Sequence, residues 1–440
     1  MNNKNKTLRI IPRSEHTLSR SNISPNALKV LNRLLQAGYS SNLVGGCVRD
    51  LLIGHQPKDF DIATDAHPEE IRALFKNSRL IGRRFRIVHV TFGREIIEVV
   101  TFRGAGTGNG QDRELRGGML VRDNVYGTME EDVWRRDFTV NALYYNIADQ
   151  SVIDFMDGMQ DLRNGVLRLI GNPEKRYRED PARMLRVIRF SAKLGFSIDA
   201  ATAEPLANLG RLLHEIAPAR LFEEVMKLFL SGHAERVFEL LEHYQLFEQL
   251  FPYSRFPADS LARRFFVKAM RNTDERIAQG KPVTPAFLIA VSLWKPVKQR
   301  AEDRIRQGQK ETIAYREAAS EILRDQAAII RQPRRFSAVA REIWMLQLRF
   351  PRRRGKRALR LLQHPRFRAA YDFLMLRVQS GETSLQEIGE WWTRIQNLDE
   401  NQQEKMAISA SRRSSGKSSR SGRRNKKGRQ KPLNENPCPE

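Results

Sequence analysis

The chain has 440 residues, which exceeds one ordinary domain and is long enough to bury a substantial core. Its 76 Lys and Arg residues outnumber 51 Asp and Glu, and the formal charge of +25 favours a polyanionic partner, a nucleic acid before an anionic membrane surface. Two cysteines exclude a disulfide framework and a cysteine-based zinc site, and no apolar run approaches the roughly 20 residues of a transmembrane helix.

Residues 1–22 are polar and basic and lack the apolar core of a signal peptide, so we expect a flexible arm on a cytoplasmic protein. A helix should follow, with Ser24 as its N-cap and Pro25 in its first turn. The segments up to residue 165 then predict a mixed α and β domain over residues 23–165. The expected strands are 42–44, 58–64, 82–92 and 94–102, the expected helices are 24–39, 47–54, 67–75 and 135–147, and 151–158 is extended.

A Gly-Gly turn lies between the first expected strand and the helix after it, in the segment VGGCVRD. The bare backbone of Gly45 and Gly46 can approach a phosphate there, and a helix N-terminus favours negative charge. Arg49, one turn into that helix, can reach the same anion. A purely structural tight turn is the alternative explanation, and for this segment taken alone it is the better one.

Two aspartates, Asp59 and Asp61, lie one residue apart in the expected strand 58–64. Alternate strand residues face the same way, so both carboxylates should project together while Phe60 and Ile62 face the core. Two ionised carboxylates this close raise each other's pKa unless a cation lies between them. Mg²⁺ suits such oxygen ligands, because it binds through one or two carboxylates plus substrate phosphates. The D-x-D pattern alone is weak, since an exposed strand end also explains it, but the glycine turn a dozen residues earlier strengthens it.

The second part of the chain has a different pattern. Segment 104–123 is rich in Gly and polar residues and predicts a mobile loop. Apolar residues then recur at i, i+3 and i+4, so we expect helices alone in segments 166–250 and 251–408. Residues 409–440 form a low-complexity tail that should stay disordered. Its ten Lys or Arg and no acid within 411–432 favour RNA contact, with a solubilising or partner-docking role as the alternative.

A row of charged residues follows in REDPARMLRVIRF. Asp180, Arg183, Arg186 and Arg189 are spaced by three, which on one helix gives an inclined polar stripe. From the residues alone, a solvated face with a surface ion pair explains the stripe as well as a ligand site does.

These segments, in this order, resemble the nucleotidyltransferase superfamily, and specifically the class II branch that contains bacterial poly(A) polymerases and tRNA CCA-adding enzymes. The resemblance rests on LVGGCVRDLLIG, KDFDIAT, EIIEVVTFR, RRDFTVNAL and REDPARMLRVIRF and covers about residues 25–250. It implies an α+β chain, with a polymerase β-like mixed head followed by an all-helical neck and body. It also implies Mg²⁺ or Mn²⁺ bound by Asp59, Asp61 and the matching carboxylate of Glu98 on a neighbouring strand.

The resemblance also implies a nucleotide-binding role for two further segments. The segment RRDFTVNAL looks like the motif that contacts the sugar and phosphates of the incoming nucleotide, and its matching residues are Arg135, Arg136, Asp137 and Asn141. Asp137 would be an active-site acid. Asp180 and Arg183 match the acid and the arginine that pair with the base edge in place of a template, while Arg186 and Arg189 would hold phosphate or the helix itself.

Three features are similar to the poly(A) polymerases within this branch: the run GRRFRIVHV with Arg83, Arg84 and Arg86, the helical segment 221–252, and the arginine-rich C-terminal extension. An edge strand blunted by charge is the alternative explanation for the first. We therefore expect AMP transfer from ATP to RNA 3′ ends, with RNA-decay or RNA-chaperone proteins as further partners. A CCA-adding tRNA nucleotidyltransferase is the alternative. A non-catalytic RNA-binding protein is disfavoured because all three carboxylates are present.

Overall fold

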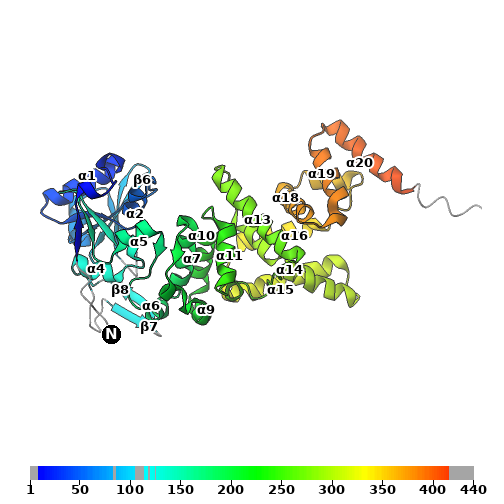
Figure 1. Cartoon of the computed structure of the whole chain (residues 1–440). Coiled ribbons are helices and arrows are strands. Elements are labelled where there is room, and N and C mark those ends of the chain that lie inside the picture. The colour runs from blue at the N-terminus through cyan, green and yellow to red at the C-terminus, as the bar shows by residue number, and fades with distance from the viewer. Residues whose placement is uncertain (1–7, 83–85, 105–112, 117–118, 124, 416–440) are drawn as a thin grey trace, which may run out of the picture. The chain divides into compact units, whose positions relative to one another are not determined.

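The computed structural model describes residues 8–82, 86–104, 113–116, 119–123 and 125–415 (Figure 1). They divide into two compact units, and each is described by itself. The first holds the described residues up to Ala258, together with Phe266–Pro285 and Glu321–Arg334. The second holds Asp259–Phe265, Ala286–Ser320 and the described residues from Arg335 onward. The division of the helical part at residue 250 stays a prediction.

A mixed sheet, eight-stranded within the described residues, is the centre of the head. Its strand order is β1-β10-β9-β2-β3-β6-β5-β4, and β3 with β6 is the parallel pair among antiparallel neighbours. The strands are β1 (Arg9–Ile11), β2 (Ser41–Val44), β3 (Asp61–Thr64), β4 (Ser78–Ile81), β5 (Ile87–Phe92), β6 (Glu95–Thr101), β9 (Leu143–Asn146) and β10 (Val152–Asp154).

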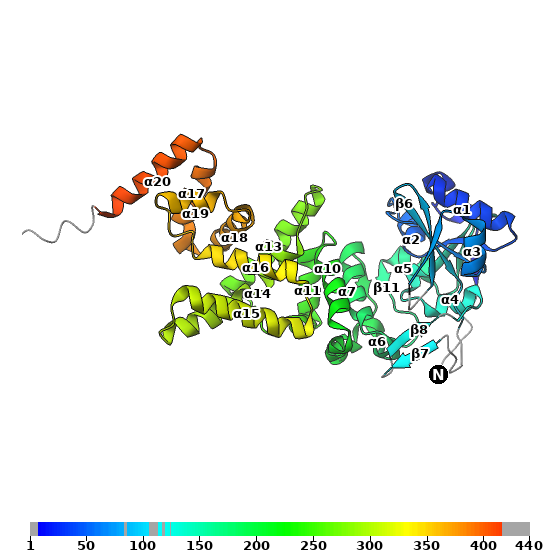
Figure 2. The ribbon, with the colours of Figure 1, turned by 180° about the vertical axis from the view of Figure 1, so that it is seen from behind.

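Helices cover both faces of this sheet. Val44, Ala63 and Tyr144 pack with Val133 of α4 on one face. Because strand residues alternate, Ile62 faces the other side, where α1 and α3 contact the strands and each other (Figure 2). The helices of the head are α1 (Pro25–Gln36), α2 (Gly46–Leu52), α3 (Pro68–Leu74), α4 (Met129–Arg135) and α5 (Gly158–Asn164).

Several predicted elements of the head are confirmed. The Ser24 hydroxyl accepts from the backbone N–H groups of Asn26 and Ala27 at 3.2 and 3.5 Å, which caps α1. The strands expected around 42–44 and 94–102 are present as β2 and β6. Strand 58–64 is shorter than expected, since it begins at Asp61 after a bend.

The expected helix 135–147 is wrong. Helix α4 ends at Arg135, a 3-10 turn covers Thr139–Asn141, and β9 follows between β2 and β10. Tyr144 and Tyr145 are fully buried there, and pairing with two strands overrides the helical pattern of the sequence.

Two segments expected to be flexible contain strands. Within the expected arm 1–22, β1 pairs with β10 and is the edge strand of the sheet, and Leu18 is fully buried. Within the expected mobile loop, β7 (Arg113–Arg116) and β8 (Met119–Asp123) form an antiparallel pair. Residues 1–7 of the arm and residues 105–112, 117 and 118 of the loop lie outside the described residues.

The helical part of the chain begins after β11 (Val166–Leu167), which pairs in parallel with β12 (Ser197–Ile198) and is a small exception to the all-helical prediction. The following helices of the first unit are α6 (Pro173–Glu179), α7 (Ala182–Leu194), α8 (Ala200–Ala203), α9 (Pro205–Leu209), α10 (Pro218–Phe229), α11 (Ala234–His243) and α12 (Phe247–Leu250).

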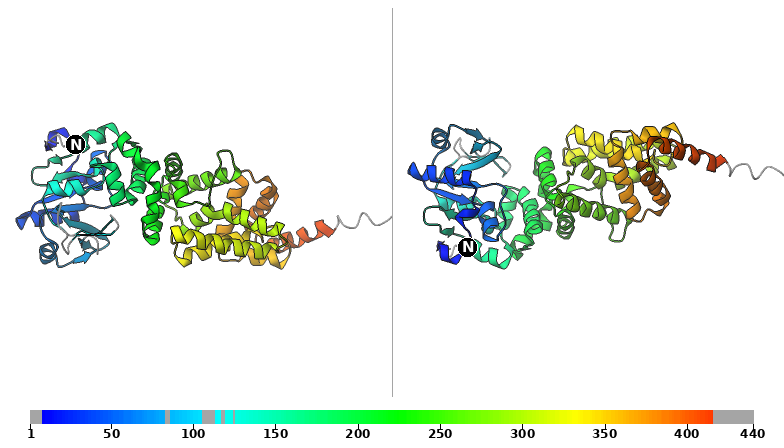
Figure 3. Two further views of the ribbon diagram at one scale, coloured as in Figure 1. Left: turned by 90° about the horizontal axis from the view of Figure 1, so that it is seen from below. Right: turned by 90° about the horizontal axis from the view of Figure 1, so that it is seen from above.

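The described part of the second unit consists of helices, which Figure 3 shows from two further sides. Aromatic side chains fill its core, where Phe350, Phe367 and Trp392 contact one another. The remaining helices of the chain are α13 (Leu261–Ala278), α14 (Pro285–Arg306), α15 (Glu311–Ile329), α16 (Arg334–Gln347), α17 (Lys356–Leu362), α18 (Phe367–Gln379), α19 (Gln386–Gln396) and α20 (Glu400–Ser415).

Helix α20 continues six residues past 409, where the disordered tail was expected to begin, because the helix starts before the low-complexity composition does. The rest of the predicted tail lies outside the described residues. In the described part of the chain, none of the helices has the length and hydropathy needed to span a membrane.

Candidate active site

Two of the three predicted metal-binding carboxylates lie side by side on the parallel strands β3 and β6. Asp61 pairs in register with Glu98 of the parallel strand β6, and Asp59 lies in an exposed bend two residues before Asp61. Burial and the negative charge of Glu98 raise the pKa of Asp61 to about 6; Asp59 adds to this rise, and Arg136 opposes it. The site therefore has an excess of negative charge that a cation would neutralise.

A divalent cation fits these oxygen donors. One oxygen of Glu98 lies 3.2 Å from Nε2 of His89 on β5, so part of this carboxylate already has a partner. Among the described residues, no three His, Cys, Asp or Glu side chains converge into a complete metal site. Mg²⁺ does not need a full protein cage, because it takes one or two carboxylates and completes its shell with substrate phosphates and water. The residues present are consistent with that mode of binding.

The glycine turn lies beside the carboxylates. Gly45 has φ of +82°, in the region that favours glycine, and it precedes α2. A Cβ atom at this position would lie 3.6 Å from Nη1 of Arg136 and 3.8 Å from Oδ2 of Asp61. A guanidinium and a carboxylate thus meet at a bare backbone turn, which is the arrangement expected for a phosphate bound next to a metal ion.

A buried network holds Arg136 in this place. Asp132, only 1% exposed, accepts hydrogen bonds from Nε and Nη2 of Arg136 at 3.1 and 2.8 Å. The Tyr144 hydroxyl donates to Asp132 at 2.6 Å and accepts from Nε of Arg136 at 2.9 Å, and the backbone N–H of Arg103 donates to the other Asp132 oxygen at 3.2 Å. These contacts leave Nη1 of Arg136 beside Gly45.

The network keeps both of its main members charged. Burial by itself would raise the pKa of Asp132, but the charges of Arg136 and Arg103 and the hydrogen bond from Tyr144 outweigh it, so the pKa lies below its ordinary value. Burial would likewise lower the pKa of Arg136, and Asp132 outweighs that effect and raises it. The guanidinium therefore stays cationic next to the glycine turn.

A second network joins the predicted nucleotide-binding residues Arg49, Asn141, Asp137 and Arg186. Arg49 is 2% exposed, donates to Asp50 at 2.8 and 2.6 Å, and also donates to the Asn141 side chain. The amide of Asn141 donates to Asp137 at 3.3 Å, and Asp137 accepts from Nε of Arg186 on α7 at 2.7 Å. The head and helix α7 are thus linked by a chain of polar contacts.

Phe190 lies beneath three of the predicted arginines. The guanidinium carbons of Arg49, Arg186 and Arg189 lie 5.3, 5.4 and 5.0 Å from its ring centre. Burial would raise the pKa of Asp137, but the Arg186 charge dominates and lowers it, so Asp137 is an ionised partner of Arg186. Its role as an active-site acid, and that of Arg49 as a phosphate ligand, stay predictions.

The predicted base-recognition pair is split between two elements. Asp180 is the C-cap of α6, and α7 begins only at Ala182, so the prediction of one continuous helical stripe is wrong at Asp180. Its carboxylate accepts from Nη2 of Arg220 on α10 at 3.0 and 2.9 Å. Arg183 instead donates to Glu179 at 3.3 Å. The two side chains have different partners in this structure.

Two further arginines, Arg135 and Arg176, bind backbone carbonyls close to the site. Arg135 donates to the carbonyl of Gly104, and Arg176 of α6 donates to the backbone carbonyls of Arg135 and Arg136, the first at 3.1 Å. Burial and the nearby charge of Arg183 lower the pKa of Arg176 to about 10. Arg176 therefore fixes the backbone that carries Arg136.

Sequence reasoning missed Asp132, Tyr144, Arg176 and Arg220. Asp132 precedes Arg136 by four residues, which is a recognisable helical pair, but the helix was expected to begin only at residue 135. Arg220 lies 40 residues from Asp180 and has no local signal.

The arginine run expected on a strand is only partly described. Arg83 and Arg84 lie outside the described residues, and Arg86, just before β5, donates to Glu69 of α3 at 3.0 Å.

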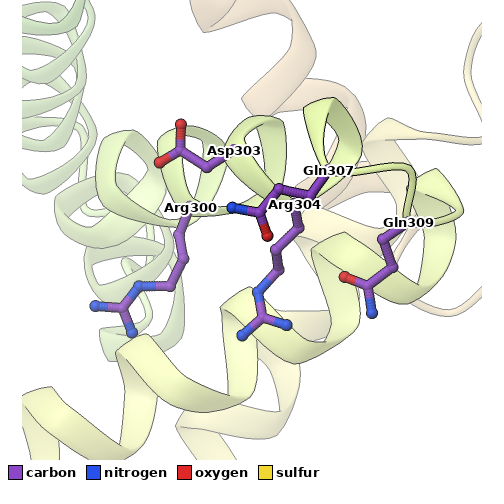
Figure 4. A pocket seen from close by; sticks show the side chains of 5 residues that line it. All are labelled: Arg300, Asp303, Arg304, Gln307 and Gln309. Carbon is purple, nitrogen blue, oxygen red and sulfur yellow. The ribbon is translucent and has the colours of Figure 1, made fainter.

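The second unit contains a polar hollow of about 510 Å³ at the end of α14 (Figure 4). Arg300 and Arg304 point to one side of the helix there, whereas Asp303 points to the other. Arg304 donates to Glu317 of α15 at 2.5 Å, and Gln309 donates to the same carboxylate at 2.8 Å. No predicted site residue lines this hollow.

Family models match three parts of the chain. Residues 41–168 match the "Poly A polymerase head domain", residues 195–255 match the "Probable RNA and SrmB- binding site of polymerase A", and residues 307–431 match the "Polymerase A arginine-rich C-terminus". The first match contains all three predicted metal-binding carboxylates.

Related sequences cover most of the chain. It is 50% identical over 400 residues to poly(A) polymerase I of Salmonella typhi, which covers 88% of this chain and 85% of the relative. Identity to poly(A) polymerase I of Haemophilus influenzae is 44% over 408 residues, with 90% of each chain covered. The CCA-adding enzyme of Lactobacillus helveticus is 37% identical over 225 residues and covers 51% of this chain and 54% of its own.

Solved structures show the same fold. A tRNA-processing enzyme complex aligns with a TM-score of 0.61 at 20% identity, covering 84% of this chain and 92% of the other. A tRNA nucleotidyltransferase complexed with a primer tRNA and an incoming ATP analog aligns with a TM-score of 0.58 at 21% identity, covering 83% and 98%. At these identities the likeness concerns the fold alone.

Proposed function

The chain belongs to the bacterial poly(A) polymerase family and is a polynucleotide adenylyltransferase, and from this premise we propose which residues transfer AMP from ATP to RNA 3′ ends without a template. One observation carries the proposal: Asp61 and Glu98 pair in register beside the Gly45 turn, where Nη1 of Arg136 also lies. Anionic oxygens for a metal and a cation for phosphate thus share one small site.

The carboxylates of Asp61 and Glu98, with Asp59 from the preceding bend, would hold divalent cations. Mg²⁺ is our choice, because oxygen donors combined with substrate phosphates are its usual environment. When bound, such ions lower the pKa of the attacking hydroxyl and neutralise charge on the phosphates during in-line displacement.

The chain's own groups orient the triphosphate. The backbone at Gly45 and Gly46 leaves room for phosphate oxygens, and Nη1 of Arg136 supplies a fixed positive charge that Asp132 and Tyr144 hold in place. Because these contacts are made before the substrate arrives, little reorganisation is needed when charge develops on the leaving pyrophosphate.

The base of ATP would lie against the start of α7. Asp180 and Arg183 lie within four residues of each other at the junction of α6 and α7, and each has an alternative partner, Arg220 and Glu179. We propose that the base replaces part of these contacts. Arg186 then links α7 to the head through Asp137, while Arg189 lies against Phe190 of the same helix.

RNA is the second substrate, and phosphate contacts supply most of its affinity. The excess of 25 positive charges fits such a partner. We propose that the arginine-rich helices of the second unit and the cationic tail contribute to this affinity. We also propose that RNA-decay or RNA-chaperone proteins are further partners and that the protein acts in the cytoplasm.

The experiment is incubation of the purified protein with Mg²⁺, a generic RNA and each nucleoside triphosphate in turn. Long adenosine ladders are expected with ATP alone. Addition that stops after the CCA sequence on a tRNA lacking that end would instead support a CCA-adding enzyme.

Variants Asp59→Ala and Asp61→Ala should abolish ATP incorporation while RNA affinity remains close to that of the wild type. Substantial polymerisation by both variants would contradict the proposed metal site.

A further inference from the structure

A row of four side chains crosses the sheet away from the glycine turn. Asp61 of β3 is opposite Glu98 of β6, Glu98 is opposite His89 of β5, and His89 is opposite Arg79 of β4. Residues directly opposite on paired strands face the same side of a sheet. The row therefore runs on one face from the site's carboxylates to an arginine on the edge strand.

This face is open to solvent beyond the carboxylates. Ile96, two residues before Glu98 on β6, is 43% exposed, and its partner Thr91 on β5 is exposed as well. Arg79 is also exposed. Helix α3, which contacts β4, β5 and β6, covers the opposite face, where Val88, Ile97 and Val99 are buried. The exposed side chains of Arg79, Thr91 and Ile96 thus share this face with the site's carboxylates.

The geometry of in-line displacement indicates that the RNA approaches from this side of the site. The glycine turn and Arg136 lie on the β2 side of Asp61, so the pyrophosphate leaves from there. In an in-line displacement the attacking hydroxyl comes from the side opposite the leaving group. The sheet order places β6, β5 and β4 on that opposite side.

The charges on this side suit a polyanion. Three exposed cations, Lys76, Arg79 and Arg94, lie at the start of β4 and at the turn between β5 and β6. Hydrogen bonds between Asn77 and Thr91 at 2.7 and 3.0 Å tie these two segments together, and β6 begins there in parallel with β3. The cations are therefore at the end of the sheet where Asp61 begins its strand.

We propose that the exposed face of β4, β5 and β6 binds the single-stranded 3′-terminal nucleotides of the RNA. Arg79 contacts a backbone phosphate, and Ile96 with His89 supplies a surface for the terminal ribose and base. This inference rests on the proposed function and adds the binding place of its second substrate. Binding through phosphate and a partly apolar surface does not depend on sequence, which suits an enzyme that must accept any 3′ end.

The test is the charge reversal Arg79→Glu in the full chain. With a short oligoadenylate as substrate, the KM for RNA should rise about tenfold or more at low salt, because a phosphate contact is replaced by repulsion. The KM for ATP should stay within about twofold, since β4, which carries Arg79, is four strands away in the sheet order from β2, which Gly45 follows.

A matched control is Arg72→Glu, because Arg72 is an exposed arginine on α3, on the other face of the sheet. It makes the same change in net charge. A rise in the KM for RNA in Arg79→Glu but not in Arg72→Glu supports the proposal. Equal effects in the two variants, or no effect in Arg79→Glu, overturn it.

A second measurement locates the RNA directly. RNA with a photoreactive thiouridine at its 3′ end should cross-link to the peptide that contains Ile96, and Ile96→Ala should reduce the yield. Cross-links confined to helices outside the head would overturn the inference. Wild-type protein that extends no RNA would refute the proposed function itself, whereas normal extension with unchanged KM for RNA in Arg79→Glu refutes only this site.

Discussion

Two kinds of buried carboxylate lie in the head, and they differ in how their charge is balanced. Asp132 and Asp137 each have an arginine partner, and the pKa of each lies below its ordinary value. Asp61 is also largely buried, but burial and its neighbour Glu98 raise its pKa to about 6. Arginines of the protein neutralise the charge of Asp132 and Asp137, whereas the charge of Asp61 requires a bound cation.

This difference separates carboxylates that hold an arginine in place from a carboxylate that is available to bind a cation. A carboxylate with a full set of hydrogen bonds fixes an arginine in place and has little left to offer a substrate. A carboxylate next to another carboxylate destabilises the fold until a cation binds, which is a common property of functional sites.

Removing the charge of Asp132 should cost the most stability. In Asp132→Asn the guanidinium of Arg136, only 16% exposed, loses its counter-charge, and the free energy of unfolding should fall by about 3–5 kcal/mol. Urea unfolding monitored by circular dichroism gives this value.

The double variant Asp132→Asn with Arg136→Gln provides the control. It should recover part of the lost stability, because no unpaired charge remains. Its KM for ATP should nevertheless be higher than that of the wild type, since the phosphate-binding cation is gone. Recovery of ATP binding in the double variant would contradict the proposed role of Arg136.

Removing the charge of Asp61 should have the opposite profile. In Asp61→Asn the rate of AMP addition should fall by about 10²–10³-fold, the effect of losing one stabiliser of transition-state charge, with no loss of stability. Single-turnover extension of labelled RNA measures the rate. Glu69→Gln, at an exposed position of α3, is the matched control and should be active.

The contributions of the two kinds of carboxylate to the free energy of unfolding should change with pH in opposite directions. The folded-state pKa of Asp61 is about 6 against 3.8 for the unfolded chain, so the folded state binds more protons between these values. Its contribution to the free energy of unfolding therefore falls as pH rises from 4 to 6, by at most about 3 kcal/mol, and stays low above that window.

Comparing wild type with Asp61→Asn in metal-free buffer isolates this contribution. The variant should become relatively more stable as pH rises from 4 to 6, and Mg²⁺ should reduce the difference at pH 7. For Asp132 the sign is reversed: its lowered pKa contributes stability above the unfolded pKa and loses it as pH falls. A pH-independent difference between wild type and Asp61→Asn would remove the basis of the comparison.

The smallest effect is expected for Tyr144→Phe. Only the hydroxyl that joins Asp132 to Arg136 is lost, which should cost about 1.5–3 kcal/mol because both partners are charged. The KM for ATP should rise modestly, as Nη1 of Arg136 becomes less well oriented. Tyr145→Phe, at the next residue of β9, lacks that contact and is the control. Equal increases in KM for the two variants would argue against a positioning role.

Much of this site could be predicted from local sequence. Phe60 and Ile62 are buried as expected, although β3 begins only at Asp61 and Asp59 lies in an exposed bend before it. Ser24 caps its helix as expected, and Gly45 has the positive φ that only a glycine adopts easily. Each of these features depends on residues within a few positions of one another.

Local sequence thus accounts for the glycine turn at Gly45, the burial of Phe60 and Ile62, and the helix that Ser24 caps, because their physics depends on neighbouring residues. Tertiary structure alone decided that Glu98 lies opposite Asp61, that Arg136 reaches Gly45, and that Asp180 binds Arg220. Strand register and long-range ion pairs depend on which segments pack together, and no spacing along the chain encodes that. For the same reason, β9 formed where a helix was expected: its pairing with β2 and β10 buries Tyr144 and Tyr145, and this tertiary packing overrides the local helical pattern.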